Sequence, residues 1–265
     1  MTIDSDEGVQ LSYEQYGEGE PLILITGFAA GSWIWFRQTG SLSKLFRTIT
    51  FNPPGIGKSE FRERPAQMRL LADDLAKLMR QLGIDQAHIL GASFGGFVAQ
   101  EFALSYPEKT RSLVLSCTSF GGPHHVPPAA EVLGTLASKE DFNTEARVRR
   151  NLVPAFSPEF AREHPELVEQ VIELRMANPV DERAYLWQIT AAVTFNAEGR
   201  VPDITAPTLV ITGDADSVVP PQNSRNLATQ IPGAKLLIVE GGSHLFFIEK
   251  SEEFNSAVIN FLKQN

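Results

Sequence analysis

The residues Gly91-Ala92-Ser93-Phe94-Gly95 combine a nucleophilic side chain with a glycine two positions to either side. This G-x-S-x-G pattern is typical of a sharp turn between a strand and a helix, from which a serine hydroxyl projects. Side chains at the outer positions would crowd such a turn. The helix that follows points backbone N–H groups at the serine. The pattern indicates a nucleophile, and the alternative is a tight glycine turn capped by serine.

A serine hydroxyl needs a general base, and His244 has the most suitable position for that role. His244 follows Gly241-Gly242-Ser243 after the apolar run Leu236–Val239. It therefore lies at the carboxyl end of a predicted strand, where active sites of open α/β sheets collect. The other histidines are expected elsewhere: His88 on the exposed or edge side of a strand, His164 in a solvated helix, and His124 and His125 in a loop.

An acid must orient that histidine, and two aspartates compete for the role. Asp214 and Asp216 both follow the apolar run Thr208–Ile211, directly after Thr212-Gly213. Either carboxylate could reach His244 from such a loop, and either could simply cap the loop. The pattern of residues leaves this choice open.

The elements that must position these side chains alternate in type along most of the chain. Strands are expected at 9–16, 22–25, 46–51, 87–90, 113–117, 208–211 and 236–239, and helices at 65–82, 97–104, 222–230 and 252–263. Such alternation predicts a doubly wound α/β fold, with a mostly parallel sheet of about eight strands. Residues 121–200 break the rhythm, because apolar residues come at helical spacing between frequent prolines. We expect a helical cap at 121–200, inserted into a core formed by 1–120 and 201–265.

Composition excludes several classes of protein. Of 265 residues, 43% are hydrophobic and 21% are charged, as in a globular domain. The net charge of −9 disfavours nucleic acid as a partner. The single cysteine, Cys117, allows no intramolecular disulfide and is expected in a buried strand. No signal peptide or apolar stretch of about 20 residues is visible, so we expect a cytoplasmic protein without membrane contact.

Several stretches together resemble the cofactor-free α/β-hydrolase family, near its small carboxylesterases, enol-lactonases and haloperoxidase-like perhydrolases. The matching stretches are Leu22-Ile23-Leu24-Ile25-Thr26-Gly27-Phe28, Gly55-Ile56-Gly57-Lys58-Ser59, Gly91–Gly96, Gly213–Pro220 and Gly241-Gly242-Ser243-His244. They span the chain except for the expected cap. The order serine, aspartate, histidine is also that of this family.

The resemblance implies roles for particular residues. In the family pattern G-[DE]-x-D-x-x-V-P the second acid belongs to the triad, which assigns Asp216 and leaves Asp214 structural. The family places its oxyanion-hole donors at the backbone N–H groups of Phe28 and Phe94. Two departures stand out: Thr26-Gly27 replaces His-Gly, and Asn52-Pro53-Pro54-Gly55 replaces Asp-x-Arg-Gly. Both are expected to remove side chains that brace the oxyanion loop.

Two tryptophans are candidates for an apolar acyl pocket: Trp33 follows the oxyanion strand and Trp187 lies in the cap. Ordinary core packing is the alternative for each. We expect no metal, because the pair His124-His125 does not recur with ligand spacing and a thiolate cluster is impossible. Gly55-Ile56-Gly57-Lys58-Ser59 lacks the spacing of a phosphate loop.

These observations predict a serine hydrolase that cleaves a small carboxylic ester or lactone through an acyl-enzyme, without a cofactor. The same triad could instead perform perhydrolysis or cleave a carbon–carbon bond beside a ketone. A receptor with slow turnover is an alternative of another class. Both a monomer and a homodimer are compatible with the sequence.

Overall fold

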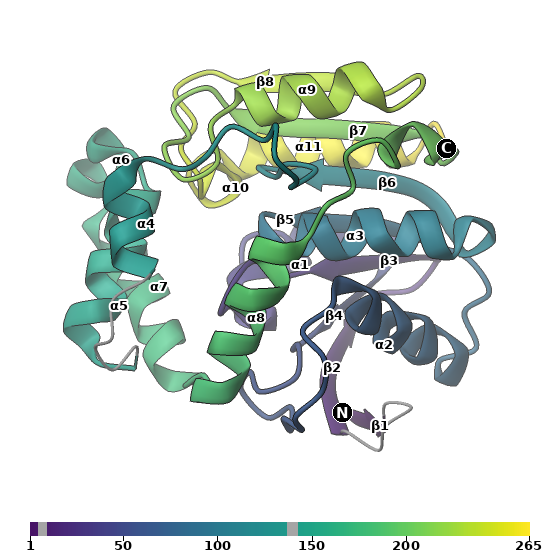
Figure 1. The fold of residues 1–265 in the computed structure, drawn as a ribbon, viewed down its shortest axis with the longest axis horizontal. Helices are drawn as coiled ribbons and strands as arrows, with labels where there is room; N and C mark the ends of the chain where they lie inside the picture. Colours follow the sequence, from purple (N-terminus) through teal and green to yellow (C-terminus); the bar gives the residue numbers. More distant parts are fainter. Residues whose placement is uncertain (5–9, 137–142) are drawn as a thin grey trace.

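A sheet forms the centre of the molecule, with helices on both of its faces (Figure 1). The structure, a computed structural model, describes residues 1–4, 10–136 and 143–265. These residues form eight strands in the order β1-β2-β4-β3-β5-β6-β7-β8. The pairs β1–β2 and β2–β4 are antiparallel, and the other neighbours are parallel. The predicted fold class is therefore confirmed.

The strands follow the apolar runs of the sequence. Their bounds are β1 (Thr2–Asp4), β2 (Gln10–Tyr16), β3 (Glu20–Ile25), β4 (Phe46–Phe51), β5 (Ala87–Ala92), β6 (Thr110–Ser116), β7 (Thr208–Gly213) and β8 (Lys235–Val239). In the central strand β3, Ile23 pairs with Ile49 of β4 and with Ile89 of β5, and all three side chains are buried. Such strands show no polar alternation because both faces of the sheet are covered. Val9, the first residue of the predicted strand 9–16, lies outside the described residues.

Two apolar cores, one on each face of the sheet, hold the helices in place. Helices α2 (Met68–Gln81), α3 (Phe94–Ser105) and α9 (Gln222–Gln230) contribute to one core. Helices α1 (Thr39–Leu42), α10 (Phe246–Glu249) and α11 (Ser251–Leu262) contribute to the other, together with the short 3₁₀ helix η1 (Ser32–Trp35). Further 3₁₀ turns are η2 (Pro107–Lys109), η3 (Val153–Ala155) and η4 (Val201–Asp203). This arrangement covers the sheet on both sides, as a doubly wound fold requires.

Two helix starts differ from prediction. Helix α2 begins at Met68 rather than Pro65, because Gln67 is extended and the carbonyls of Arg64 and Pro65 accept the Trp187 indole N–H. Helix α3 begins at Phe94 rather than Phe97, because Gly95 and its neighbouring glycine continue the helix instead of ending the turn.

The position predicted for His88 is also wrong. His88 lies inside the central strand β5, paired with β3 on one side and β6 on the other, and its side chain is fully buried. Its Nδ1 lies 2.8 Å from the Ser112 hydroxyl oxygen, and its Nε2 lies 3.4 Å from a carboxylate oxygen of Glu20. These polar partners allow a histidine in an otherwise apolar strand. Burial lowers the pKa of His88, and the nearby Arg111 guanidinium adds to that effect against the opposing influence of Glu20.

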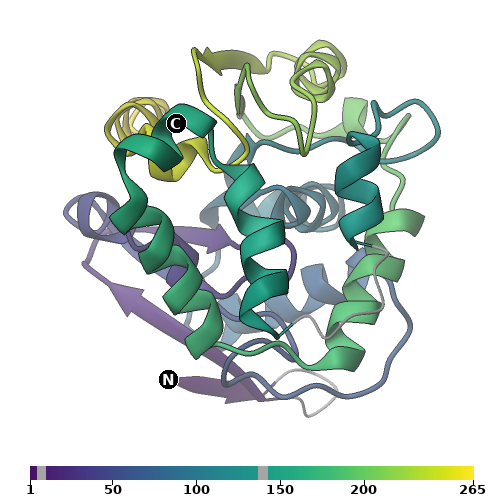
Figure 2. The ribbon, with the colours of Figure 1, turned by 90° about the vertical axis from the view of Figure 1, so that its left-hand side faces the viewer.

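Between β6 and β7, the described residues include several helices, which face the viewer in Figure 2. The helices are α4 (Ala130–Leu136), α5 (Glu145–Leu152), α6 (Pro158–Glu163), α7 (Pro165–Ala177) and α8 (Glu182–Thr194), called the cap helices below. The predicted boundaries at 120/121 and 200/201 remain predictions. Within the described ranges, no helix is both long and apolar enough to cross a membrane.

Candidate active site

Ser93 stands at the junction of β5 and α3 with a strained backbone. Its φ of 54° and ψ of −119° lie in a region that non-glycine residues seldom adopt, as expected where a side chain is held for function. Glycine is required on both sides. A Cβ at Gly91 would lie 2.2 Å from the Gly95 carbonyl oxygen, and a Cβ at Gly95 would lie 2.3 Å from the Ile25 carbonyl oxygen. The crowding expected from the sequence is therefore present at this turn.

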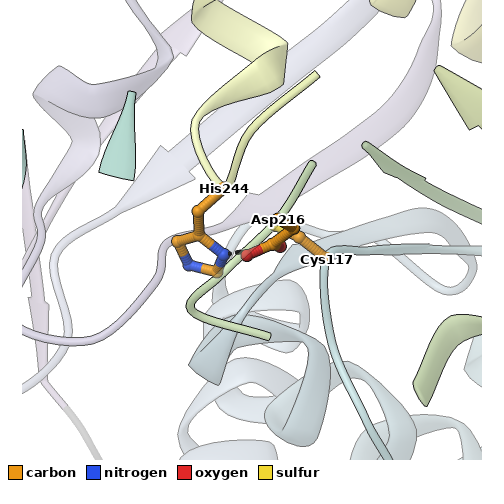
Figure 3. A group of neighbouring side chains, drawn as sticks. All are labelled: Cys117, Asp216 and His244. Carbon is orange, nitrogen blue, oxygen red and sulfur yellow. Dashed lines mark hydrogen bonds and ion pairs between the residues drawn. The ribbon is translucent and has the colours of Figure 1, made fainter. Parts of the chain in front are cut away.

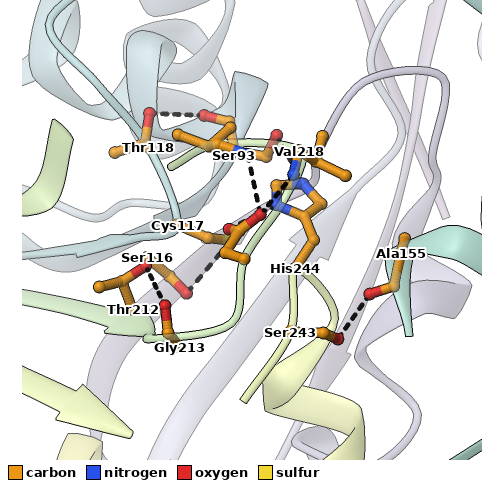
Figure 4. A network of polar contacts seen from close by, with 12 residues as sticks. Ser93, Ser116, Cys117, Thr118, Ala155, Thr212, Gly213, Val218, Ser243 and His244 are labelled. Atoms are coloured by element: carbon orange, nitrogen blue, oxygen red, sulfur yellow. Dashed lines mark hydrogen bonds and ion pairs between the residues drawn. The ribbon is translucent and has the colours of Figure 1, made fainter. Parts of the chain in front are cut away.

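Hydrogen bonds connect Ser93 to His244 (Figure 4) and His244 to Asp216 (Figure 3), and the three residues come from different loops. His244 Nε2 lies 3.1 Å from Ser93 Oγ, and His244 Nδ1 lies 2.8 Å from Asp216 Oδ2. The histidine is 8% exposed and the aspartate is 4% exposed, so water does not compete strongly for the bond between them. This arrangement can carry a proton from a serine hydroxyl to an imidazole that a carboxylate orients.

The structure separates the two aspartates that the residue pattern left open. Asp216 Oδ1 accepts hydrogen bonds from the backbone N–H groups of Val218 (2.9 Å) and Val219 (2.8 Å), which hold its other oxygen toward His244. Asp214 instead accepts from the backbone N–H of Gly241 at 2.7 Å in an exposed turn. The carboxylate at the imidazole is thus Asp216, the residue that the resemblance indicated.

The loop that carries His244 is held by a carboxylate absent from the sequence-based predictions. Glu249 accepts from the backbone N–H groups of Ser243 and Ser157. The Ser243 hydroxyl lies 2.7 Å from Glu249 Oε1 and 2.6 Å from the Ala155 carbonyl oxygen. These bonds connect the histidine loop to the segment before α6. No local motif signals them, because Ala155 is 88 residues away from Ser243.

The loop after β3, residues 26–32, lies against the serine turn. The Ala30 N–H donates to the Gly27 carbonyl at 3.3 Å, and Ala29 between them has a φ of 51°. The Thr26 hydroxyl donates to the Ala30 carbonyl at 2.9 Å, and Asn52 Oδ1 accepts from the Ser32 N–H at 2.7 Å. The loop is therefore braced by Thr26 and Asn52, although the departures are expected to remove the side chains that brace it in the family. Thr26 and Asn52 form hydrogen bonds of their own to this loop.

Phe28 and Phe94, the expected oxyanion-hole residues, are neighbours. Their ring centroids are 6.3 Å apart with an edge-on geometry. A Cβ at Gly27 would lie 3.6 Å from the Ser93 Cβ, so the Phe28 loop directly adjoins the serine. Among the described residues, no protein acceptor binds the N–H of either phenylalanine.

The two tryptophans proposed for a pocket have different surroundings. Trp187 is 8% exposed, donates its indole N–H to the carbonyls of Arg64 (2.9 Å) and Pro65 (3.0 Å), and lies under the Arg64 guanidinium. These contacts favour packing. Trp33 packs against the core beneath the loop that it follows, and its indole nitrogen has no acceptor among the described residues. A contact of either ring with substrate remains a prediction.

Cys117 lies behind the aspartate, and its Sγ forms a close group with side-chain atoms of Asp216 and His244 (Figure 3). The ligand atoms of these residues lie within 4.8 Å of one another. Burial raises the pKa of the Cys117 thiol, and the Asp216 charge adds to the rise. A metal needs a thiolate and a free carboxylate. Here the thiol is kept protonated and the carboxylate is bound to the histidine, so the arrangement fits a triad better than a metal site.

The remaining histidines lie at the surface. His124 contacts Glu198 at 2.8 Å in an exposed position, and the His125 Nδ1 lies 2.6 Å from the Gly122 carbonyl oxygen. His164 is half-exposed beside Glu166. Of the histidines, His244 alone contacts Ser93 in the part of the chain that the structure describes.

Known proteins resemble this chain over most of its length. A poly(3-hydroxyalkanoate) depolymerase from Ectopseudomonas oleovorans is 31% identical, over 92% of this chain and 84% of its own. A 2-hydroxy-6-oxononadienedioate/2-hydroxy-6-oxononatrienedioate hydrolase from Burkholderia vietnamiensis is 30% identical, over 99% of this chain and 94% of its own. The solved structure of a thermophilic esterase from Thermogutta terrifontis matches with a TM-score of 0.82 and 26% identity, covering 100% of this chain and 98% of the other.

These relatives are hydrolases, although the compounds in their names differ. The profile of the alpha/beta hydrolase fold family matches residues 20–251, which includes the serine turn, the aspartate loop and the histidine loop. The fold, the order of the site residues and this match agree, and the chain belongs to the α/β-hydrolase fold family.

Proposed function

We propose that this protein is a carboxylic ester hydrolase in which Ser93 is the nucleophile, His244 the general base and Asp216 the acid that orients it. The observation that carries the proposal is the continuous pair of hydrogen bonds, 3.1 Å and 2.8 Å, that starts at a strained serine. Ser112 also lies beside a histidine, His88, but it belongs to the regular strand β6. Among the described residues, Ser93 is the serine that combines a histidine partner with a positive φ.

In the first half of the reaction, Ser93 Oγ attacks the ester carbonyl carbon while its proton moves to His244 Nε2. The charge that develops on the carbonyl oxygen is stabilised by the N–H groups of Phe28 and Phe94, which have no protein acceptor among the described residues. Donors that are already oriented cost no reorganisation when the charge forms. The imidazolium then gives its proton to the departing alkoxide, and an acyl group remains on Ser93.

In the second half, water replaces the alcohol. His244 takes a proton from that water, whose oxygen attacks the acyl carbon, and the Ser93–acyl bond breaks as the proton returns to the serine oxygen. Asp216 stabilises the cationic imidazole in both halves through its bond to Nδ1. The substrate class is a small neutral ester or lactone, and no step needs a metal or an organic cofactor.

The test compares wild type with Ser93→Ala, using short p-nitrophenyl esters and a fluorophosphonate that labels activated serines. We expect saturable ester hydrolysis and labelling of one serine in the wild type. Both should disappear in the variant, with the unfolding transition unchanged. A folded wild-type protein that neither hydrolyses the esters nor reacts with the probe would refute the proposal.

A second candidate is hydrolysis of a carbon–carbon bond by the same three residues. It is favoured by the 30% identity to a hydrolase whose substrate name describes a ketone and carboxylates but no ester. In that case the bond beside the ketone breaks after attack on the carbonyl. Turnover of a 2-hydroxy-6-oxodienoate that exceeds turnover of matched esters by a wide margin would favour this candidate over the ester hydrolase.

A further inference from the structure

The cap helix α8 contacts the loop that carries the Phe28 amide. Gln188 of α8 is 1% exposed, and its Oε1 accepts a hydrogen bond of 2.9 Å from the backbone N–H of Ala29. One turn earlier on the same helix, the Tyr185 ring meets the Phe28 ring edge-on, with centroids 4.8 Å apart. Residues of α8 and of the loop also share one apolar cluster. The cap and the oxyanion loop are therefore packed as one unit.

The start of α8 is anchored close to this loop. The Asp181 N–H donates to the Gly55 carbonyl at 3.0 Å, and Ile56 forms a β-bridge with Val180. A Cβ at Gly55 would lie 2.2 Å from the Ala184 Cβ, so α8 and the segment with Gly55 and Ile56, which follows β4, approach as closely as glycine allows. These contacts fix the position and rotation of α8, and so they fix where the Gln188 side chain meets the loop of residues 26–32.

The bond from Gln188 acts on the strained residue of the loop. The turn from Gly27 to Ala30 has a positive φ at its third residue, as in a type II turn, a conformation that glycine prefers. Ala29 is held there although its Cβ disfavours it. Without an acceptor for the Ala29 N–H, rotation of the Phe28–Ala29 peptide would relieve this strain. That rotation changes ψ of Phe28 and φ of Ala29, and so disturbs the turn, closed by the bond from the Ala30 N–H to the Gly27 carbonyl, that holds the Gly27–Phe28 peptide with the Phe28 N–H.

We infer that Gln188 is a positioning residue: its side-chain oxygen locks the Phe28–Ala29 peptide and thereby orients the Phe28 N–H toward the developing oxyanion. The inference rests on the proposed function, in which that amide stabilises the transition state. It makes the catalytic site dependent on the seating of α8. A cap that moves away takes the Gln188 oxygen with it and leaves the triad intact but the oxyanion hole disordered.

The test uses variants that separate the acceptor from the packing. Gln188→Met keeps the volume but has no oxygen acceptor, whereas Gln188→Glu keeps an oxygen in either protonation state. Thr190→Ala, at an exposed position of α8, is the matched control. We expect Gln188→Met to lower kcat about tenfold with little change in KM, as for loss of one hydrogen bond needed in the transition state. Gln188→Glu should recover most of that loss, and Thr190→Ala should match wild type.

A structural readout that needs no substrate accompanies the kinetics. Hydrogen exchange at the Ala29 amide should be slow in the wild type and much faster in Gln188→Met. The preference for an oxygen ester over its thiono analogue should also shrink in this variant, because a misplaced donor no longer favours an oxyanion. If Gln188→Met does not fold, Gln188→Asn, which withdraws the oxygen by one methylene, gives the same comparison.

Wild-type kcat in a folded Gln188→Met, or unchanged protection of the Ala29 amide, would overturn the inference. Failure of the proposed function looks different, since the wild type itself would then lack ester hydrolysis and serine labelling. In that event the exchange measurement still decides whether Gln188 holds the loop.

Discussion

Replacing Asp216 with asparagine tests the assignment of the acid most directly. Asp216 Oδ1 already accepts from two backbone N–H groups, those of Val218 and Val219. In Asp216→Asn the amide oxygen must keep this place, because the NH₂ group cannot accept. The NH₂ then faces His244 Nδ1, which has to accept rather than donate. The imidazole is left with its proton on Nε2, where it cannot take the proton from Ser93.

The size of the effect follows from these two losses. Removing a hydrogen bond between charged groups costs about 1.5–3 kcal/mol. Imposing the wrong tautomer adds to this, and in a serine protease triad the same change lowers kcat by about 10⁴. A 10⁴-fold loss corresponds to about 5.5 kcal/mol in the activation barrier. We expect a fall in kcat of this order for Asp216→Asn, with KM nearly unchanged.

The matched control is Asp214→Asn. Asp214 accepts one hydrogen bond, from the Gly241 N–H in an exposed turn, and an amide oxygen can accept it equally. Its kcat should stay within about threefold of wild type, since an exposed group contributes less than about 1 kcal/mol. The assay is hydrolysis of a short p-nitrophenyl ester by both variants, with thermal unfolding measured in parallel. Loss of less than about tenfold in Asp216→Asn, or a larger loss in Asp214→Asn, would refute the reasoning.

Three further predictions concern stability and accessibility. Folding lowers the pKa of His88 below its ordinary value of 6.5, so the unfolded chain binds this proton more readily than the folded protein. The contribution of His88 to the free energy of unfolding should therefore be constant above about pH 6.5 and fall as the pH is lowered further. The fall should be less steep in His88→Gln, and equal slopes in the two proteins would contradict this. Glu249→Ala leaves the backbone N–H groups of Ser243 and Ser157 without their acceptor and should lower the urea-unfolding free energy by about 2 kcal/mol. An unchanged unfolding midpoint would rule this out. Cys117 is fully buried and its thiol is kept protonated beside Asp216, so a thiol reagent should label it only after unfolding, and rapid labelling of the native protein would show that this side of the site is open.

Much of the fold could be predicted because its signals are local. The covered strands appear as unbroken apolar runs, and the sheet they form is of the expected doubly wound, mostly parallel class. The errors fall where tertiary contacts compete with local preference. Pro65 suits a first helical turn, yet the Trp187 indole binds the carbonyl there and α2 starts at Met68. His88 is polar, yet a strand on each side and a serine partner bury it.

The candidate site likewise has features that the sequence predicts and features that depend on tertiary contacts. A serine between glycines, a histidine after a strand and two aspartates on one loop are visible in the sequence, because each depends on a few neighbouring residues. The choice between Asp214 and Asp216 by geometry requires the position of the imidazole, which comes from a loop 28 residues beyond Asp216.

The sequence by itself therefore determined the class of fold and the residue types available for chemistry. Only the tertiary structure decided what supports them. Gln188 meets Ala29 across 159 residues of chain, and Glu249 joins the histidine loop to the start of α6. Local propensity carries no information on such contacts, because their energy exists only after the sheet has brought the loops together. Ser93 acquires its surroundings from that assembly: glycines nearby in sequence admit the strained turn, and side chains distant in sequence hold the loops around it.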